Sequence, residues 1–391
     1  MSTESPNKTF CVYPFDYTVV RTTGMITPCC AMTTEQNISG QSVSDAWNSD
    51  FMHEIRHKML AGKKVDECHR CYKTEADTGP SLRTTMWDQY QTKHIPLTDI
   101  TRPRRFPRGI EIHLGNYCNL KCLTCCPRDS SMFAVEERKL KLLSPPTQHS
   151  NYQVITEINP DRIDQLIKDC QDHEITLLDL RGGEVTIMPQ AKRILDTLPA
   201  SLAKNITLRV QTNGQRIDAH WQDLWSKFHQ VNVSVSVDAY GETNDYIRYP
   251  SRWHNLEENI QLLRSLPNVE VGITCTVSNL NLLRLAEFDA WARPLDVPYH
   301  TDGSGKYKIT HTSYHFLHWP TLFQAQNLPA PLFDQARQQL MHVPELTKFF
   351  ENSSNDAEWP QFCHTIDRRD AYRKNRIFDI LPELKPYWTT R

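Results

Sequence analysis

The sequence predicts an α/β fold built on a parallel sheet. From Gly109 to about His300, strand-like apolar runs alternate with helical segments, an order typical of βαβ units. Asn159 and Pro160 mark the start of one helix, because Asn caps helices and Pro fits their first turn. The expected strands are residues 109–115, 174–180, 205–212, 231–238, 269–277 and 295–300. The expected helices are residues 160–171, 189–198, 217–228, 254–266 and 281–292.

Length and cysteine positions indicate how the chain divides. Its 391 residues suffice for two or three domains, and nine of its 12 cysteines fall before residue 127. In the first hundred residues, apolar side chains recur every four positions from Trp47 to Met59 and predict one helix over residues 44–60. We expect a cysteine-rich unit over residues 1–100, a barrel over 101–305 and a helical C-terminal extension over 306–391, with helices at 332–342 and 360–379.

Composition argues against several classes of protein. The formal net charge is −2 with a pI of about 6.8, so no overall basic field favours nucleic acid as a partner. The apolar runs are shorter than the ~20 residues that a membrane helix needs, and the first residues lack the apolar core of a secretory signal. Cysteines without an export signal indicate reduced thiols. We therefore expect a cytoplasmic protein that binds neither membranes nor nucleic acid.

The most informative motif is a cysteine triplet. Cys118, Cys122 and Cys125 have the spacing Cys-x3-Cys-x2-Cys. Residues 110–114, just before the triplet, alternate as in a strand, so we expect the cysteines on a loop at that strand's C-terminal end. Three thiolates can bind three irons of a 4Fe–4S cluster, which leaves the fourth iron open to a substrate. A zinc site is the alternative, since Cys-x2-Cys pairs also bind zinc; the uneven gaps suit closed tetrahedral zinc poorly.

The triplet, with Asn119 and Leu120 after its first cysteine, resembles the cluster loop of the radical S-adenosylmethionine (radical SAM) enzymes. The resemblance implies that SAM chelates the open iron, and that an electron from the reduced cluster cleaves it to methionine and a 5′-deoxyadenosyl radical. It also implies a partial TIM-like (β/α)6 barrel in place of a closed eight-unit barrel. A reductant such as a flavodoxin or ferredoxin would then be a partner.

A second motif follows the second expected strand. Arg181 precedes Gly182, Gly183 and Glu184, and consecutive glycines let the backbone approach a ligand closely. These three residues resemble the Gly-Gly-Glu motif that binds the SAM amino group in the family, although Val185 replaces the usual proline. A simple turn is the alternative.

Polar residues at later strand ends complete the expected SAM site. Thr212 and Asn213 follow the third strand, Ser236 and Asp238 end the fourth, and Arg248 lies in the next loop. The resemblance makes them candidates for contacts with the SAM ribose and carboxylate, and guanidinium suits a carboxylate. The alternative for the four strand-end residues is that they simply terminate their strands. The alternative for Arg248 is that it is an exposed arginine without a role in binding.

The N-terminal cysteines resemble another iron–sulfur module. Cys11, Cys29, Cys68 and Cys71 follow the first part of the SPASM pattern, or of its shortened form, twitch. The resemblance implies one auxiliary 4Fe–4S cluster on these four residues, with Cys30 as a substitute ligand. Two alternatives stay open: a zinc site, and a different ligand set, because the module usually follows the barrel and precedes it here.

The expected function combines these motifs. The chain resembles a radical SAM enzyme that abstracts hydrogen from a substrate, with Cys118, Cys122 and Cys125 as its catalytic cluster ligands. Relatives with the auxiliary module act on ribosomally made peptides, protein side chains or small molecules, and we expect a peptide first. Two alternatives are a non-catalytic iron–sulfur electron-transfer protein and a zinc-stabilised binding module.

Overall fold

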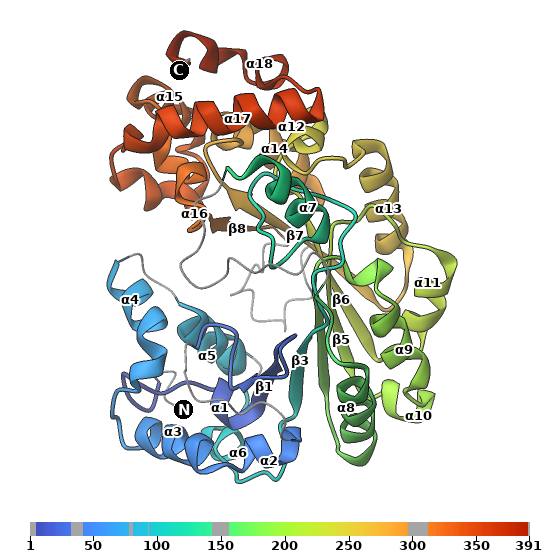
Figure 1. Cartoon of the computed structure of the whole chain (residues 1–391). Coiled ribbons are helices and arrows are strands. Elements are labelled where there is room, and N and C mark those ends of the chain that lie inside the picture. The colour runs from blue at the N-terminus through green and yellow to red at the C-terminus, as the bar shows by residue number, and fades with distance from the viewer. Residues whose placement is uncertain are drawn as a thin grey trace.

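The computed structural model describes residues 5–32, 42–77, 81–92, 94–142, 156–295 and 312–389. Within these residues one sheet has the linear strand order β2-β1-β3-β4-β5-β6-β7-β8 (Figure 1). Only β1 and β2 pair antiparallel, and all other neighbours are parallel. The strands are β1 (Tyr17–Val20), β2 (Ile26–Thr27), β3 (Gly109–His113), β4 (Leu177–Arg181), β5 (Thr207–Thr212), β6 (Gln230–Ser236), β7 (Val269–Val277) and β8 (Thr312–Phe316).

Alternation along the strands gives the sheet two different faces. In β6, Val231, Val233 and Val235 are buried in the main core, whereas the residues between them are half-buried. Because successive strand side chains point to opposite faces of the sheet, each strand contributes apolar side chains to one face and polar side chains to the other. The outer face is the one packed against helices. The inner face, on the opposite side, carries Glu111, Asp179, Arg209 and Asn232, which lie level with one another on adjacent strands.

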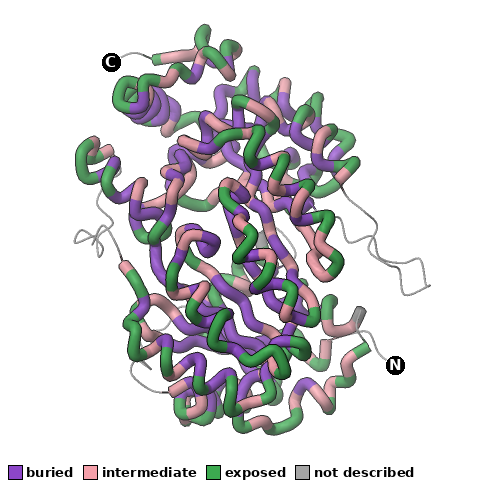
Figure 2. Tube along the Cα trace, turned by 90° about the vertical axis from the view of Figure 1, so that its right-hand side faces the viewer, coloured by how far each residue is buried: buried purple, intermediate pink, exposed green. Residues whose placement is uncertain are grey.

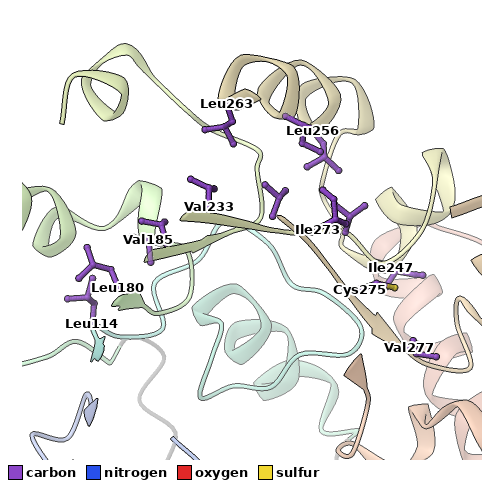
Figure 3. Close-up of a cluster of buried hydrophobic side chains, with 14 of the residues drawn as sticks. Leu114, Leu180, Val185, Val233, Ile247, Leu256, Leu263, Ile273, Cys275 and Val277 are labelled. Atoms are coloured by element: carbon purple, nitrogen blue, oxygen red, sulfur yellow. The ribbon is translucent and has the colours of Figure 1, made fainter. Parts of the chain in front are cut away.

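Helices cover the outer face and build the two ends of the molecule. Figure 1 shows α8, α9, α11 and α13 along the outer side of the sheet and the last helices beyond β8. Figure 3 shows Val233 and Ile273 in the core beneath Leu263 and Leu256 of α13, and Leu180 beside Val185 and Leu114. The helices are α1 (Tyr13–Asp16), α2 (Val43–Trp47), α3 (Asp50–Leu60), α4 (His69–Asp77), α5 (Leu82–Thr92), α6 (Leu97–Ile100), α7 (Ser131–Leu140), α8 (Pro160–Asp172), α9 (Pro189–Thr197), α10 (Ala200–Ala203), α11 (Ala219–Ser226), α12 (Gly241–Ile247), α13 (Trp253–Ser265), α14 (Leu285–Ala292), α15 (Ala330–Leu340), α16 (Pro344–Thr347), α17 (Trp359–Arg373) and α18 (Ile377–Ile380).

The predicted α/β class and the open, partial barrel are confirmed. Five expected strands match β3 to β7, and β2 and β8 lie at opposite ends of the strand order. Of the sixth expected strand, residues 296–300 lie outside the described residues; the strand paired with β7 is β8. The sequence prediction missed β1 and β2, which are only four and two residues long and come from the cysteine-rich unit.

The predicted helices are also found, with two corrections. The single helix expected over residues 44–60 is wrong, because α2 ends before Ser49, whose side chain caps α3 by accepting a hydrogen bond from the Met52 amide. The helix expected over 360–379 is divided too. Lys374 adopts a left-handed conformation with φ of 60° and ends α17, and α18 follows as a separate short helix.

The N-terminal residues have a core of their own beside the main one. Phe10, Trp47 and Met59 are buried there, separately from the residues that pack between sheet and outer helices. The helices after β8 share the main core, and Figure 2 shows buried segments running through both regions. The proposed domain boundaries stay a prediction. Among the described residues, no helix combines the length and apolar character needed to span a bilayer.

Truncation of one core residue tests this packing. Leu180→Ala removes a fully buried side chain from β4, so the free energy of unfolding should fall by about 2–5 kcal/mol. The matched control is Leu60→Ala, at a position that is 53% exposed, which should change it by less than about 0.5 kcal/mol. Urea unfolding of both variants measures the difference; equal midpoints would contradict the assigned core.

Candidate functional site

The cysteine loop, residues 115–130, connects β3 to α7. Cys118 and Cys122 are buried and Cys125 is half-buried, and all three contact one another or Leu120 in one small cluster. The Leu120 amide donates a hydrogen bond to the Cys118 sulfur over 3.4 Å. The loop therefore brings together the three thiols that the sequence predicted as cluster ligands.

The electrostatics of these thiols suit a metal-bound group. Burial, with a smaller contribution from the nearby Cys122, raises the pKa of Cys118 to about 12. Burial also raises the pKa of Cys122 and of Cys125, and for Cys122 the positive charge of Arg248 partly offsets the effect. Iron ions would supply the charge that such thiolates need. The donor set fits three irons of a cluster.

Backbone hydrogen bonds fix the loop on two sides. Gly183 donates to the carbonyl of Gly115, and Glu184 donates to that of Tyr117, both over 2.9 Å. On the other side, Lys121 donates to the carbonyl of Tyr249 over 2.7 Å. The loop is thus attached to the Gly-Gly-Glu segment after β4 and to the segment after α12.

The Glu184 side chain connects the ends of two strands. Its Oε1 accepts hydrogen bonds from the hydroxyls of Thr186 and Thr212, each over 2.6 Å. Its Oε2 accepts from the Asn213 amide over 2.6 Å. Asn213 in turn donates from Nδ2 to Oδ1 of Asn119, beside Cys118, over 2.8 Å. These side chains form a latch, which we call the Glu184 latch, between β4, β5 and the cysteine loop.

The two glycines are needed for packing within the protein. A Cβ at Gly183 would lie 2.5 Å from the Tyr117 carbonyl oxygen and 2.6 Å from that of Asn116. A Cβ at Gly182 would lie 2.7 Å from the end of the Met188 side chain, which can move. Close approach to a ligand was the predicted reason for these glycines. The structure adds a second reason, because the backbone of Gly183 packs directly against the backbone of the cysteine loop.

Arg248 and Asp238 form a buried ion pair beside the thiols. Arg248 Nη1 lies 2.9 Å from Asp238 Oδ2, and the Thr276 amide donates to Asp238 Oδ1 over 2.9 Å. The alternative of an exposed arginine is therefore wrong. Arg248 Nε is buried, and within the described ranges it has no hydrogen-bond partner. Ser236 lies nearby on the inner face and accepts a hydrogen bond from Gln211 over 3.3 Å.

The four N-terminal cysteines line one cavity. Cys11 precedes α1, Cys29 follows β2, Cys68 ends a short 3-10 helix directly before α4, and Cys71 lies in the first turn of α4. All four border the same cavity with Arg83. Burial raises the pKa of Cys11, and Cys29, Cys68 and Cys71 raise it further. Thiols that influence one another in this way suit a cluster with four cysteine ligands.

Cys30 does not line this cavity. It is exposed, and its carbonyl accepts a hydrogen bond from Arg21 over 2.7 Å. In the part of the chain that the structure describes, no three His, Cys, Asp or Glu side chains are arranged to hold a single metal ion. The geometry favours Cys29 over Cys30 as the fourth ligand.

Sequence reasoning missed an ionic network on the inner face. The Tyr17 hydroxyl lies 3.2 Å from Glu111 Oε2 and 3.3 Å from Asp179 Oδ2. Arg181 Nε lies 2.7 Å from Asp179 Oδ1, and His113 Nε2 lies 2.5 Å from Glu111 Oε1. The signal was present, since charged residues alternate with Ile and Leu in β3 and β4. The network links β1, from the cysteine-rich unit, to the barrel.

Comparison with known families agrees with this geometry. A model of the radical SAM superfamily matches residues 112–284. The chain contains a radical SAM domain. A second model, SPASM, described as an iron–sulfur cluster-binding domain, matches residues 11–72, so the resemblance stated for the N-terminal cysteines is confirmed as well. The radical SAM match includes the cysteine triplet, the Gly-Gly-Glu segment and Arg248.

The solved structures similar to this chain share little sequence with it. Native anSMEcpe with bound AdoMet is 18% identical with a TM-score of 0.40, and the match covers 64% of each chain. SuiB of Streptococcus suis, bound to precursor peptide SuiA, is 15% identical with a TM-score of 0.37, covering 81% of this chain and 68% of that one. The methyltransferase TsrM from Kitasatospora setae is 13% identical with a TM-score of 0.35, covering 55% and 38%. No curated protein matches the chain.

The two glycines give a matched pair of variants. Gly183→Ala places a methyl group against backbone oxygens of the cysteine loop, so it should displace the loop and lower the iron bound by the barrel site. Gly182→Ala meets the movable end of Met188 and should keep more of that iron. Iron analysis after anaerobic reconstitution compares them. Full iron content in Gly183→Ala would contradict the role given to this contact.

Proposed function

We propose that this protein is a radical SAM enzyme that cleaves SAM reductively and abstracts hydrogen from a peptide or protein side chain. The observation that carries the proposal is the convergence of three thiols on one loop, attached to the Gly-Gly-Glu segment and beside Arg248. When bound there, a 4Fe–4S cluster with an open iron supplies the electron that converts SAM to methionine and a 5′-deoxyadenosyl radical. The chain's own residues hold and orient the reactants.

The geometry suggests how SAM would be oriented. The side-chain oxygens of Glu184 are occupied within the latch, so Gly182, Gly183 and Glu184 would contact the SAM amino group through their backbone. Arg248 has a buried Nε without a partner among the described residues, and a carboxylate would satisfy it. Thr212, Asn213, Ser236 and Asp238 lie at the ends of β5 and β6 and would border the nucleoside.

The inner face supports a hydrophilic target. Arg209 lies mid-strand on this face between Asp179 and Asn232 of the neighbouring strands. An apolar substrate bound against this face would bury the polar groups of such residues without hydrogen-bond partners, which costs free energy. A polar side chain of a peptide or protein suits it better. A polar small molecule is the second candidate for the same reason.

The auxiliary site is close enough to this face to take part. Tyr13 lines the cavity of the four cysteines and packs edge-to-face against Tyr17. The Tyr17 hydroxyl in turn contacts Glu111 and Asp179 on the inner face, so these two rings connect the auxiliary site to that face. We propose that Cys11, Cys29, Cys68 and Cys71 bind a second 4Fe–4S cluster that accepts an electron from the product radical or anchors the substrate. A flavodoxin or ferredoxin would reduce the barrel cluster.

Metal analysis tests the two cluster sites together. Two 4Fe–4S clusters require about eight irons and about eight sulfides per chain, measured after anaerobic reconstitution. Replacing Cys118, Cys122 and Cys125 by Ala should remove about half of both. Stoichiometric zinc without sulfide at either site would favour the zinc alternative there.

A double variant separates the roles of the sites. Cys68→Ala with Cys71→Ala leaves the barrel thiols intact, so the variant should still form 5′-deoxyadenosine when reduced with dithionite. It should fail to modify the substrate, found by comparing peptides from cells with the wild-type protein and with Cys122→Ala. A thermal melt controls for folding. Normal modification by a folded double variant would exclude a catalytic role for the auxiliary cluster, and absence of SAM cleavage by the wild type would favour an electron carrier.

A further inference from the structure

Two arginines of α17 are buried against α7, the helix that follows the cysteine loop. Arg369 is completely buried, with Nη1 2.5 Å from Glu136 Oε1 and Nη2 2.7 Å from Glu137 Oε2. Arg373 is 7% exposed, and its Nη2 lies 2.8 Å from Glu136 Oε1. Figure 1 shows α17 crossing above α7, although more than 200 residues separate them in sequence.

Arg373 also reaches the cysteine loop itself. Its Nη2 donates to the Lys121 carbonyl over 2.6 Å, and Lys121 lies between Cys118 and Cys122. The Lys121 ammonium lies 2.9 Å from Glu136 Oε2. The Arg373 guanidinium also packs 5.3 Å from the ring centre of Tyr249, whose carbonyl binds the Lys121 amide. One side chain of α17 thus contacts both the loop and one of its supports.

The charges in this cluster do not cancel. Lys121, Arg369 and Arg373 carry three positive charges against the carboxylates of Glu136 and Glu137. Burial would raise the pKa of Glu136, but hydrogen bonds from Arg373 and Lys121 outweigh burial and hold it at about 2. Arg373 is also hydrogen-bonded to the carbonyl of Lys121, the residue directly before Cys122. Its positive charge therefore lies beside a predicted cluster ligand.

Stability alone is a weak explanation for this arrangement. Buried ion pairs lose much of their Coulomb energy to desolvation, and apolar residues of similar volume often stabilise a helix contact better. What apolar residues cannot provide is a hydrogen bond to a loop carbonyl together with a positive charge near the thiols. Reduction of a cluster adds a negative charge, which a nearby cation stabilises.

We propose that α17 belongs to the radical SAM site, with Arg373 as a positioning residue that holds the cysteine loop through the Lys121 carbonyl and raises the reduction potential of the cluster bound there. The proposal rests on the proposed function, because it assumes a redox-active cluster on Cys118, Cys122 and Cys125. It assigns a role in the chemistry to a segment of the chain in which the sequence shows no motif.

Three variants test the proposal. Arg373→Met removes the charge and the hydrogen bonds, Arg373→Lys keeps the charge, and Arg284→Met is the matched control. Arg284 binds Glu383 over 2.8 Å and the Ile380 carbonyl over 3.0 Å. Its loss therefore loosens the same C-terminal segment, and among the described residues it makes no hydrogen bond or ion pair with the cysteine loop. All three are made in the full chain that also carries Cys68→Ala and Cys71→Ala, so that only the barrel cluster is observed.

The readouts are the reduction potential from redox titration followed by EPR, and the rate at which a chelator removes iron. We expect a more negative potential in Arg373→Met, a potential near that of the parent in Arg373→Lys, and faster iron loss in both. Arg284→Met should match the parent in both readouts. If Arg373→Met does not fold, the rates of iron loss from Arg373→Lys and Arg284→Met are compared. Faster loss from Arg373→Lys supports the proposal, and equal rates contradict it.

Two results would overturn the proposal. One is an unchanged potential in a folded, iron-loaded Arg373→Met together with unchanged iron loss in Arg373→Lys. The other is an equal effect of Arg284→Met, which would reduce the role of Arg373 to holding the C-terminal segment. Failure of the proposed function looks different, because the parent chain would then either hold no reducible cluster or hold one that does not cleave SAM.

Discussion

The site depends on holding a loop of buried thiols in place without regular secondary structure. Thiols this buried resist ionisation, as the raised pKa of Cys118 shows, so the loop must be positioned by its neighbours before iron can compensate the charge. The Glu184 latch does this from β4 and β5. The contacts of Lys121 do it from the opposite side.

This arrangement changes how the Gly-Gly-Glu motif is understood. The backbone amides of Gly183 and Glu184 donate hydrogen bonds to carbonyls of the cysteine loop, and both carboxylate oxygens of Glu184 accept hydrogen bonds from the protein. A motif that resembles a SAM-binding segment is therefore also a support for the cysteine loop. The proposed SAM and cluster sites would be coupled through this one short segment, so a substitution in it should affect both.

Local signals made much of the fold predictable from sequence. Strand alternation located β3 to β7, and cysteine spacing located the triplet, because each of these patterns lies within one short segment. The four N-terminal cysteines are spread over residues 11–71 and were found through their resemblance to a known module. Long-range contacts gave no such signal. Glu184 meets Asn213 across 29 residues and Arg369 meets Glu136 across 233, and nothing beside either residue indicates its partner. Strand β1 escaped prediction because four residues are too few to show a period.

The central claim is that the iron bound at Cys118, Cys122 and Cys125 has an open position that SAM occupies. The most direct measurement is the EPR spectrum of the reduced barrel cluster, recorded in the Cys68→Ala, Cys71→Ala variant before and after SAM is added. Our account predicts altered g values on addition of SAM, because a ligand binds the cluster itself. Identical spectra at saturating SAM would contradict it and show a cluster without an open iron.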